Sequence, residues 1–260
     1  MEDNFKFLEI AKQAALASGK ILNSYFRKNP EVAKKGPVDI VTEADIESEK
    51  KIIEIISKNF PNHSILSEEK GKIEGSSEFE WIIDPLDGTT NFANKLPIFS
   101  VSIALYKNKN PLIGVVFNPY TDELYWAVSH NGSYLGQKKI YVSDKKNIND
   151  SLIVTGFPYN FMEILDELSQ RFFNVLKISR GVRRLGSAAL DLCFVASGVF
   201  EGFFEQNLKP WDTAAGIIIA HEAGAIITDL KNNDYNPYMN EIIASNGHIH
   251  NSILKAMEIK

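Results

Sequence analysis

Apolar residues recur at helical spacing near the start of the chain. Within residues 5–27 the apolar positions are Phe7, Leu8, Ala11, Ala14, Ala15, Ile21 and Leu22. This spacing predicts an amphipathic helix. A second helix is predicted to begin at Thr42, because Thr42 and Asp45 form a pattern like a capping box. The apolar face predicted for this second helix consists of Ile46, Ile52, Ile53 and Ile56.

The pattern changes after residue 60. Short β-branched or aromatic segments separated by turn residues predict strands at 64–66, 80–83, 99–106, 111–117 and 123–128. Beyond residue 150, strands predicted at 152–155, 199–205 and 242–244 alternate with helices predicted at 161–175, 187–196, 212–223 and 251–257. The sequence therefore predicts an α/β protein with an α+β first half and a layered α/β second half.

Composition and charge narrow the class of protein. The chain has 260 residues, of which 44% are apolar and 23% charged, typical of a globular protein. Its formal net charge of −5 disfavours a nucleic-acid partner, which clustered Lys and Arg would have to bind. The single cysteine, Cys193, excludes an internal disulfide and a Cys-rich zinc site. With no signal-like N-terminus and no long apolar run, we expect a cytoplasmic protein without a membrane partner.

The segment Trp81–Asn91 carries the most distinctive chemistry. An apolar run leads into Asp84 and Asp87, which are followed by Gly88 and two threonines. Two carboxylates held together repel each other unless a cation lies between them, and oxygen ligands favour Mg²⁺, Mn²⁺ or Ca²⁺. Free N–H groups at Thr89, where a helix could begin, would suit a phosphate. A solvated Asp-Pro-x-Asp-Gly turn explains the same residues equally well.

Three further acids each have a simpler explanation. Glu68 follows a predicted strand and could be plain surface charge. Asp212 stands at the start of an apolar helix, where it could serve as a capping or first-turn acid. Asp45 is already explained by its place in the capping box.

Several enzyme classes lack their motifs here. The chain has neither Gly-x-Ser-x-Gly nor a Walker loop, which disfavours a serine hydrolase and a P-loop kinase. Asp84 and Asp87 are three residues apart, not two as in the Asp-x-Asp motif of aspartyl-phosphate enzymes. A covalent phosphoenzyme is therefore not expected.

Two long motifs together resemble the paired signature of the inositol monophosphatase family. They are Asp84-Pro85-Leu86-Asp87-Gly88-Thr89-Thr90-Asn91-Phe92 and Trp211-Asp212-Thr213-Ala214-Ala215-Gly216. Further matches in the family's order extend the resemblance over nearly the whole chain: 37–45, 67–69, 186–189 and 222–224. The resemblance implies a single domain over 1–260 with the sugar-phosphatase fold of alternating helix and sheet layers. Residues 1–145 would form its metal-binding half and residues 146–260 its substrate half.

The same resemblance implies a metal-dependent phosphomonoesterase. Glu68, Asp84 and the Leu86 carbonyl would hold one Mg²⁺, while Asp84, Asp87 and Asp212 would hold a second. A third ion would sit near Glu68, and Mn²⁺ could replace Mg²⁺. Thr89, paired with Asp45, would orient the attacking water. Two ions can stabilise the attacking and leaving oxygens of an in-line displacement, so no catalytic His or Cys is needed.

Substrate residues are also implied by the resemblance. Phosphate would meet the N–H groups of Gly88 and Thr89, and Asp87 and Asp212 would face the substrate. The helix start at Gly186, Ser187 and Ala188 would line the same pocket. Glu205 would bind a polyol hydroxyl, although an exposed strand-end acid is the simpler reading. Arg183, next to Arg184, could bind a second phosphate or pair with acids at a subunit interface.

The predicted reaction is Mg²⁺-dependent hydrolysis of a small phosphorylated polyol or sugar, with myo-inositol 1-phosphate as the first choice. Fructose 1,6-bisphosphate is the nearest alternative, alone or as one of two substrates. Histidinol phosphate and 3′-phosphoadenosine 5′-phosphate follow. A different class of function is a scaffold that binds the transcription machinery. Family resemblance also implies sensitivity to Li⁺ and a homodimer.

Overall fold

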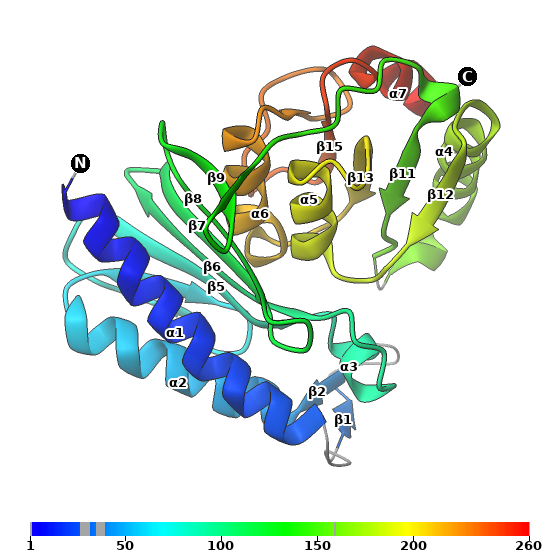
Figure 1. Cartoon of the computed structure of the whole chain (residues 1–260). Helices are drawn as coiled ribbons and strands as arrows, with labels where there is room; N and C mark the ends of the chain where they lie inside the picture. The colour runs from blue at the N-terminus through cyan, green and yellow to red at the C-terminus, as the bar shows by residue number, and fades with distance from the viewer. Residues whose placement is uncertain (1, 27–31, 35–39, 159, 260) are drawn as a thin grey trace.

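Helices and sheets stack in five alternating layers in the computed structural model, which describes residues 2–26, 32–34, 40–158 and 160–259 (Figure 1). The helices are α1 (Glu2–Phe26), α2 (Glu43–Asn59), α3 (Thr89–Ala93), α4 (Leu165–Ile178), α5 (Ala188–Ala196), α6 (Pro210–Glu222) and α7 (His250–Met257), with 3₁₀ turns η1 (Ile148–Asp150) and η2 (Phe161–Ile164). The strands are β1 (Val32–Lys34), β2 (Ile40–Thr42), β3 (Ser64–Ser67), β4 (Gly71–Ile73), β5 (Phe79–Asp87), β6 (Ser100–Lys107), β7 (Asn110–Asn118), β8 (Glu123–Val128), β9 (Gly132–Leu135), β10 (Lys138–Ile140), β11 (Leu152–Thr155), β12 (Gly181–Arg184), β13 (Gly202–Gln206), β14 (Ile226–Thr228) and β15 (Glu241–Ser245). This arrangement confirms the predicted layered α/β fold.

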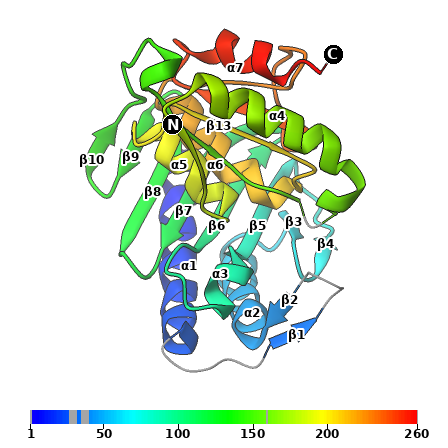
Figure 2. The same ribbon diagram turned by 90° about the vertical axis from the view of Figure 1, so that its right-hand side faces the viewer.

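The larger sheet has eight strands in the order β10-β9-β8-β7-β6-β5-β3-β4. Every neighbouring pair is antiparallel except β3 and β5, which run parallel. Helices α1 and α2 cover one face, and α5 and α6 cover the other (Figures 1 and 2). Both faces of β5 are therefore buried, which fits its nearly continuous apolar sequence from Trp81 to Ile83.

The smaller sheet has five strands in the order β12-β11-β13-β15-β14. Strand β11 runs parallel to β12 and β13, while β15 runs antiparallel to β13 and β14. Helices α4 and α7 pack on its outer side, and α5 and α6 separate it from the larger sheet (Figure 2). Cys193 is fully buried in α5, within this middle helix layer.

Most predicted elements are found within a few residues of their expected bounds, but the face of α2 is a correction. Ile46 is 54% exposed, whereas Ile52 and Ile56 are buried as expected. The inward face instead carries the polar residues Asp45, Ser48 and Glu49. A helix start at Thr42 is consistent with α2 beginning at Glu43, but the Thr42 side chain and residues 37–39 lie outside the described residues. The short edge strand β4, at Gly71–Ile73, was not predicted.

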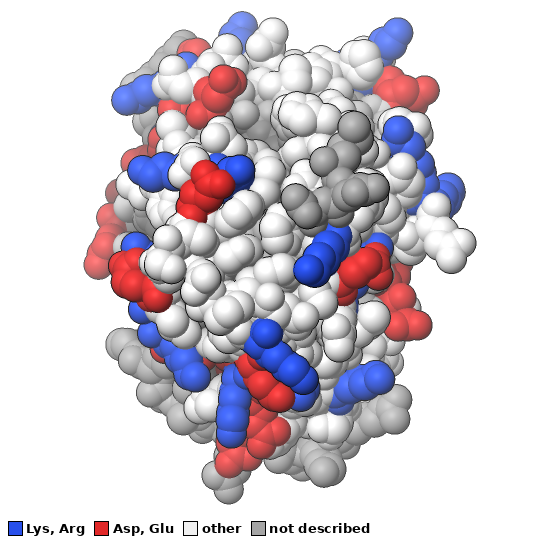
Figure 3. All heavy atoms as spheres, turned by 90° about the vertical axis from the view of Figure 1, so that its left-hand side faces the viewer, with Lys and Arg blue, Asp and Glu red and all other residues white. Residues whose placement is uncertain are grey.

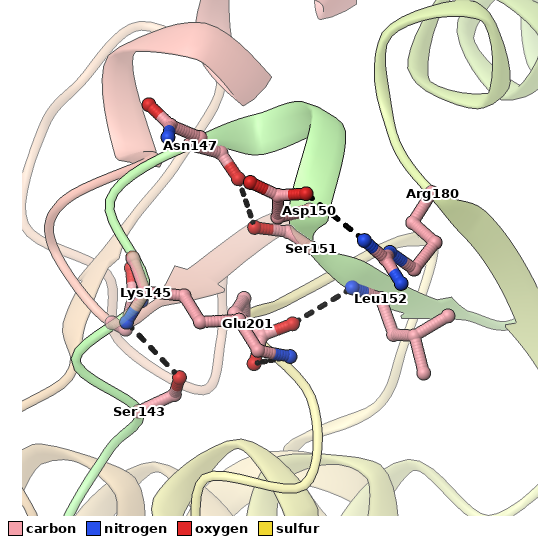
Figure 4. A network of polar contacts seen from close by, with 9 residues as sticks. Ser143, Lys145, Asn147, Asp150, Ser151, Leu152, Arg180 and Glu201 are labelled. Atoms are coloured by element: carbon pink, nitrogen blue, oxygen red, sulfur yellow. Dashed lines mark hydrogen bonds and ion pairs between the residues drawn. The ribbon is translucent and has the colours of Figure 1, made fainter.

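A buried acid ties the connection after the large sheet to the smaller sheet. Glu201 is fully buried, accepts a hydrogen bond from the Leu152 N–H at 2.7 Å, and pairs with Lys145 at 3.1 Å (Figure 4). Its backbone carbonyl accepts the Asn246 N–H, and the Asn246 amide in turn donates to the Lys145 carbonyl. These contacts fix the entry into β11, the strand that leads to the site described below.

Candidate active site

A cavity of about 590 Å³ opens between the C-terminal end of β5 and the smaller sheet. Its lining consists of Glu68, Asp87, Gly88, Thr90, Gly156, Phe157, Pro158, Asn160, Arg184, Gly186, Ala188, Glu205, Asn207, Leu208, Lys209, Trp211, Asp212 and Asn240. We call Glu68, Asp84, Asp87 and Asp212 the acidic wall; Asp84 lies behind the surface, 2% exposed. We call Gly156, Arg184, Glu205 and Lys209 the mixed wall.

The two aspartates of β5 owe their placement to an irregularity in the strand. Pairing with β6 is regular up to Asp84, shifts, and resumes at Asp87 opposite Ser100. The segment that a solvated turn would also explain is therefore a bulge inside a continuous strand. Within it, an Asp84 Oδ1 acceptor binds the Leu86 N–H at 3.0 Å. A bulge re-aims side chains, and this one brings Asp84 and Asp87 to the same end of the sheet.

Asp87 is held by the segment that begins α5. Its Oδ2 accepts hydrogen bonds from the Ser187 hydroxyl at 2.5 Å and from the Ala189 N–H at 2.9 Å. Ser187 was expected to line the pocket, but the structure places it behind Asp87 as a donor. The contact joins the two halves of the chain directly at the site.

Crowding of the acids shifts their protonation. Burial, followed by the charges of Glu68, Asp87 and Asp212, raises the pKa of Asp84. Burial raises the pKa of Asp87 to about 6, although its hydrogen bonds from Ser187 and Ala189 oppose the shift. Burial also raises the pKa of Asp212, against a hydrogen bond of 2.7 Å from the Lys209 N–H to Asp212 Oδ2. Asp212 is thus both a capping acid at the start of α6, as the sequence alone suggested, and a member of the acidic wall.

Such a set of oxygen donors fits a divalent cation, which would relieve both repulsion and desolvation. In the geometry of the described residues, no three His, Cys, Asp or Glu side chains are yet arranged as the ligands of one ion. The charges of Glu68, Asp87 and Asp212 nevertheless act on Asp84, so the four acids lie close enough to influence one another. Leu86 O, the expected carbonyl ligand, accepts a hydrogen bond from Thr89 Oγ1 at 3.0 Å.

Thr89 begins α3 behind the cavity. Its hydroxyl lies 3.2 Å from Asp45 Oδ1, and both residues are buried. The pair expected from the sequence is therefore in contact. Gly88, which precedes it, has φ +92°, and a Cβ there would approach Ile98 O at 2.9 Å, so only glycine suits this position.

Glu49 on α2 is a site residue that the sequence reasoning missed. Its Oε1 accepts hydrogen bonds from the Ser67 hydroxyl and from the N–H groups of Glu69 and Lys70, each N–H at 3.0 Å. Glu49 is 1% exposed and so anchors the turn that carries Glu68. A helical acid next to lysines reads as surface charge, so no sequence signal distinguished it.

The mixed wall contains one correction. Of the two adjacent arginines, Arg184 lines the cavity, whereas Arg183 does not and donates instead to the Val182 carbonyl. Lys209 was not expected at the site and also lines the cavity. Glu205 lines it as expected, and burial, together with the charge of Asp212, raises its pKa.

Asp191 lies one helical turn after Ser187 in α5. It is fully buried, and neither carboxyl oxygen has a hydrogen-bond partner among the described residues. Burial and the neighbouring charges of Glu205 and Asp87 raise the pKa of its carboxyl, against the opposing charge of Arg184. It had not been singled out from the sequence, where it reads as one acid inside an apolar helix.

Comparison with known proteins identifies the family. Residues 3–260 match the model of the inositol monophosphatase family. The chain belongs to this family. A protein of Aquifex aeolicus named fructose-1,6-bisphosphatase/inositol-1-monophosphatase is 41% identical over 258 residues, covering 98% of this chain and 96% of that protein. A "Nus factor SuhB" of Haemophilus influenzae is 43% identical over 225 residues, covering 85% and 84%.

Solved structures of the inositol monophosphatase family share the fold. The inositol monophosphatase from Anabaena (Nostoc) superposes with a TM-score of 0.89 at 41% identity, covering 97% of this chain and 95% of that one. The extragenic suppressor protein suhB from Bartonella henselae gives a TM-score of 0.93 at 37% identity, covering 97% and 98%. The protein is accordingly an enzyme of the phosphomonoester hydrolase class. No helix in the described ranges is long and apolar enough to cross a membrane.

Proposed function

We propose that the protein hydrolyses a small phosphorylated polyol, with myo-inositol 1-phosphate as the first choice and Mg²⁺ as the cofactor. The observation that carries the proposal is the acidic wall, in which three acids line the cavity and Asp84 lies buried behind its surface. The mixed wall of the same cavity offers polyol- and anion-binding groups. The name of the Anabaena structure supports the same reaction. A cavity of about 590 Å³ is within the range that small-molecule sites occupy.

Glu68, Asp84, Leu86 O, Asp87 and Asp212 would hold two or three ions, Mg²⁺ or Mn²⁺. When bound, such ions neutralise phosphate charge and lower the pKa of water. The contact between Thr89 and Asp45 orients the hydroxyl that positions the attacking water. Amide groups of Gly88 and Thr89 bind phosphate oxygens, and Ser187 keeps Asp87 turned towards the cavity. Gly186 and Ala188 shape the floor, while Glu205 accepts a hydrogen bond from a polyol hydroxyl.

Fructose 1,6-bisphosphate is the second candidate substrate, favoured by one feature. Arg184 and Lys209 place two cationic side chains in the mixed wall, where a second phosphate would be bound. The name of the Aquifex relative points in the same direction. With a substrate that has one phosphate, Arg184 and Lys209 would have only the neighbouring acids as oppositely charged partners.

The test is phosphate release from myo-inositol 1-phosphate, fructose 1,6-bisphosphate, histidinol phosphate and 3′-phosphoadenosine 5′-phosphate, with Mg²⁺ and after chelation. We expect the first or second to be preferred and chelation to abolish the activity. Activity unchanged by chelation would overturn the metal assignment. Addition of Li⁺ and a measurement of mass in solution test the expected inhibition and the expected homodimer.

A scaffold role would be separate from catalysis and is suggested by two relatives named Nus factor SuhB. On the face of the molecule drawn in Figure 3, cationic and anionic side chains are interspersed, without a broad patch of one sign among the coloured residues. A pull-down of transcription proteins by Asp87→Asn, with phosphate release lost, would establish such a role as independent of catalysis.

A further inference from the structure

Glu205 packs directly against the backbone of Gly156. A Cβ built on Gly156 would lie 2.2 Å from each carboxyl oxygen of Glu205 and 2.3 Å from its carboxyl carbon. Atoms cannot approach so closely, so the carboxyl group occupies the space that any other side chain at residue 156 would take. Both residues line the cavity, and both belong to the mixed wall.

The residue before Gly156 is anchored in the smaller sheet. Strand β11 ends at Thr155, which pairs in parallel register with Phe204, the residue before Glu205. The fully buried Thr155 hydroxyl donates to the Phe204 carbonyl at 2.7 Å. Since the two strands are joined immediately beside the contact, an added methyl group would displace the Glu205 side chain rather than the turn.

Packing, rather than hydrogen bonding, holds the Glu205 carboxyl group. It makes no hydrogen bond to any residue within the described ranges, although it is only 7% exposed. By contrast, Asp87 in the acidic wall accepts hydrogen bonds from Ser187 and Ala189. The place of the Glu205 oxygens therefore depends on the surface beneath them, which is Gly156, and on the attraction of the Arg184 charge.

We infer that Gly156 is a positioning residue for substrate recognition: its lack of a side chain sets where the Glu205 carboxyl group meets a substrate hydroxyl. The inference rests on the proposed function, in which Glu205 binds the polyol. Gly156 would act through Glu205 and would not touch the reacting atoms. It would thereby select substrates that carry a hydroxyl group within reach of that position.

The test compares two phosphomonoesters in Gly156→Ala. The backbone at Gly156 does not have the positive φ that only glycine adopts readily, so the variant should fold. We expect KM for myo-inositol 1-phosphate to rise about 10-fold, within the range for a buried group that loses its hydrogen-bond partner. The ratio of its kcat/KM to that of p-nitrophenyl phosphate, which has no hydroxyl, should fall by the same factor. Gly181→Ala on β12 is the matched control, because its Cβ would meet only the flexible end of Arg183, at 3.2 Å, and Leu152.

A double-mutant cycle separates positioning from general damage. Glu205→Ala should lower the same ratio, and adding Gly156→Ala to it should change nothing more. Additive losses would overturn the inference. The inference would also be overturned if Gly156→Ala kept the wild-type ratio while Glu205→Ala lowered it. If Glu205→Ala itself kept the wild-type ratio, the proposed role of Glu205 would be refuted instead. A crystal structure of Gly156→Ala with the Glu205 carboxyl group unmoved would overturn the inference whatever the activity.

Discussion

The acidic wall and the mixed wall face the same cavity but are built differently. Asp84 and Asp87 come from one bulged strand end, and hydrogen bonds from Ser187, Ala189 and Leu86 fix them. The members of the mixed wall come from separate segments, and Glu205 is held by packing. Hydrogen-bonded groups are pre-organised for chemistry. A group held by packing can be moved by a substitution beneath it without disturbing the acids. We therefore expect the acidic wall to govern the reaction and the mixed wall to govern the choice of substrate.

The largest effect should follow from a change in the acidic wall. Asp87→Asn removes a negative charge from the metal-binding set, and we expect phosphate release to fall by about 10²–10³-fold for every substrate. Steady-state kinetics across the substrate panel measures this loss. Asp144→Asn, which changes an exposed acid outside the cavity, is the control. A loss confined to one substrate would break the division between the two walls.

A smaller effect is expected behind the acidic wall, at Glu49. Glu49→Gln keeps the shape but weakens the acceptor for the Glu69 and Lys70 N–H groups. Supporting residues of this kind alter metal affinity or activity by about 10–100-fold. We expect the variant to need more Mg²⁺ for half-maximal activity, with activity restored at saturation. Glu54→Gln on the exposed side of α2 is the control, and an equal Mg²⁺ requirement in both variants would refute the anchoring role.

In the mixed wall, Arg184→Gln should be selective. We expect kcat/KM for fructose 1,6-bisphosphate to fall about 10-fold relative to that for myo-inositol 1-phosphate, since one charge-assisted contact to the second phosphate is lost. The neighbouring Arg183→Gln provides a close control because Arg183 does not line the cavity. Equal losses on both substrates would show that Arg184 does not serve a second phosphate.

The smallest effect concerns the stability of the fold and involves the buried Asp191 in α5. Asp191 has a raised pKa when folded, so between the unfolded value of about 3.9 and the folded value the native state holds a proton that the unfolded chain has lost. Stability from this group is therefore lost as pH rises through the folded pKa. Near pH 4 we expect Asp191→Asn to unfold at the wild-type temperature. Near pH 8 it should unfold at a higher temperature, because its free energy of unfolding exceeds that of the wild type by about 1–3 kcal/mol. Thermal unfolding of the metal-free proteins checks this, and a difference independent of pH would contradict it.

The acidic wall was largely predictable because its chemistry is local. Asp84, Asp87 and the glycine and threonine that follow are contiguous, so a short motif contains most of the information. Asp212 and Glu68 were added by the family resemblance, and the structure brings them to the same cavity. Glu205 came from that resemblance as well.

The remaining site residues depend on tertiary contacts that a single sequence does not display. The exposed Ile46 and the buried Glu49 depart from the apolar face expected for α2, because a polar site rather than an apolar core covers that part of the helix. Whether Arg183 or Arg184 faces the cavity depends on the register of a short strand, β12. The seat of Glu205 on Gly156 joins two strands separated by nearly fifty residues, and a lone glycine after a strand is ordinary turn chemistry.

Cys193 can serve as a natural probe of opening in the helix layer between the two sheets. It is the single thiol of the chain, it lies fully buried in α5, and burial raises its pKa so that the reactive thiolate is suppressed. Reaction with a thiol reagent must therefore await local or global unfolding of the middle helix layer. The same helix begins at Ser187 and Ala189, the donors that hold Asp87. The rate of the thiol reaction therefore measures how often this helix opens, and no label has to be introduced by mutation.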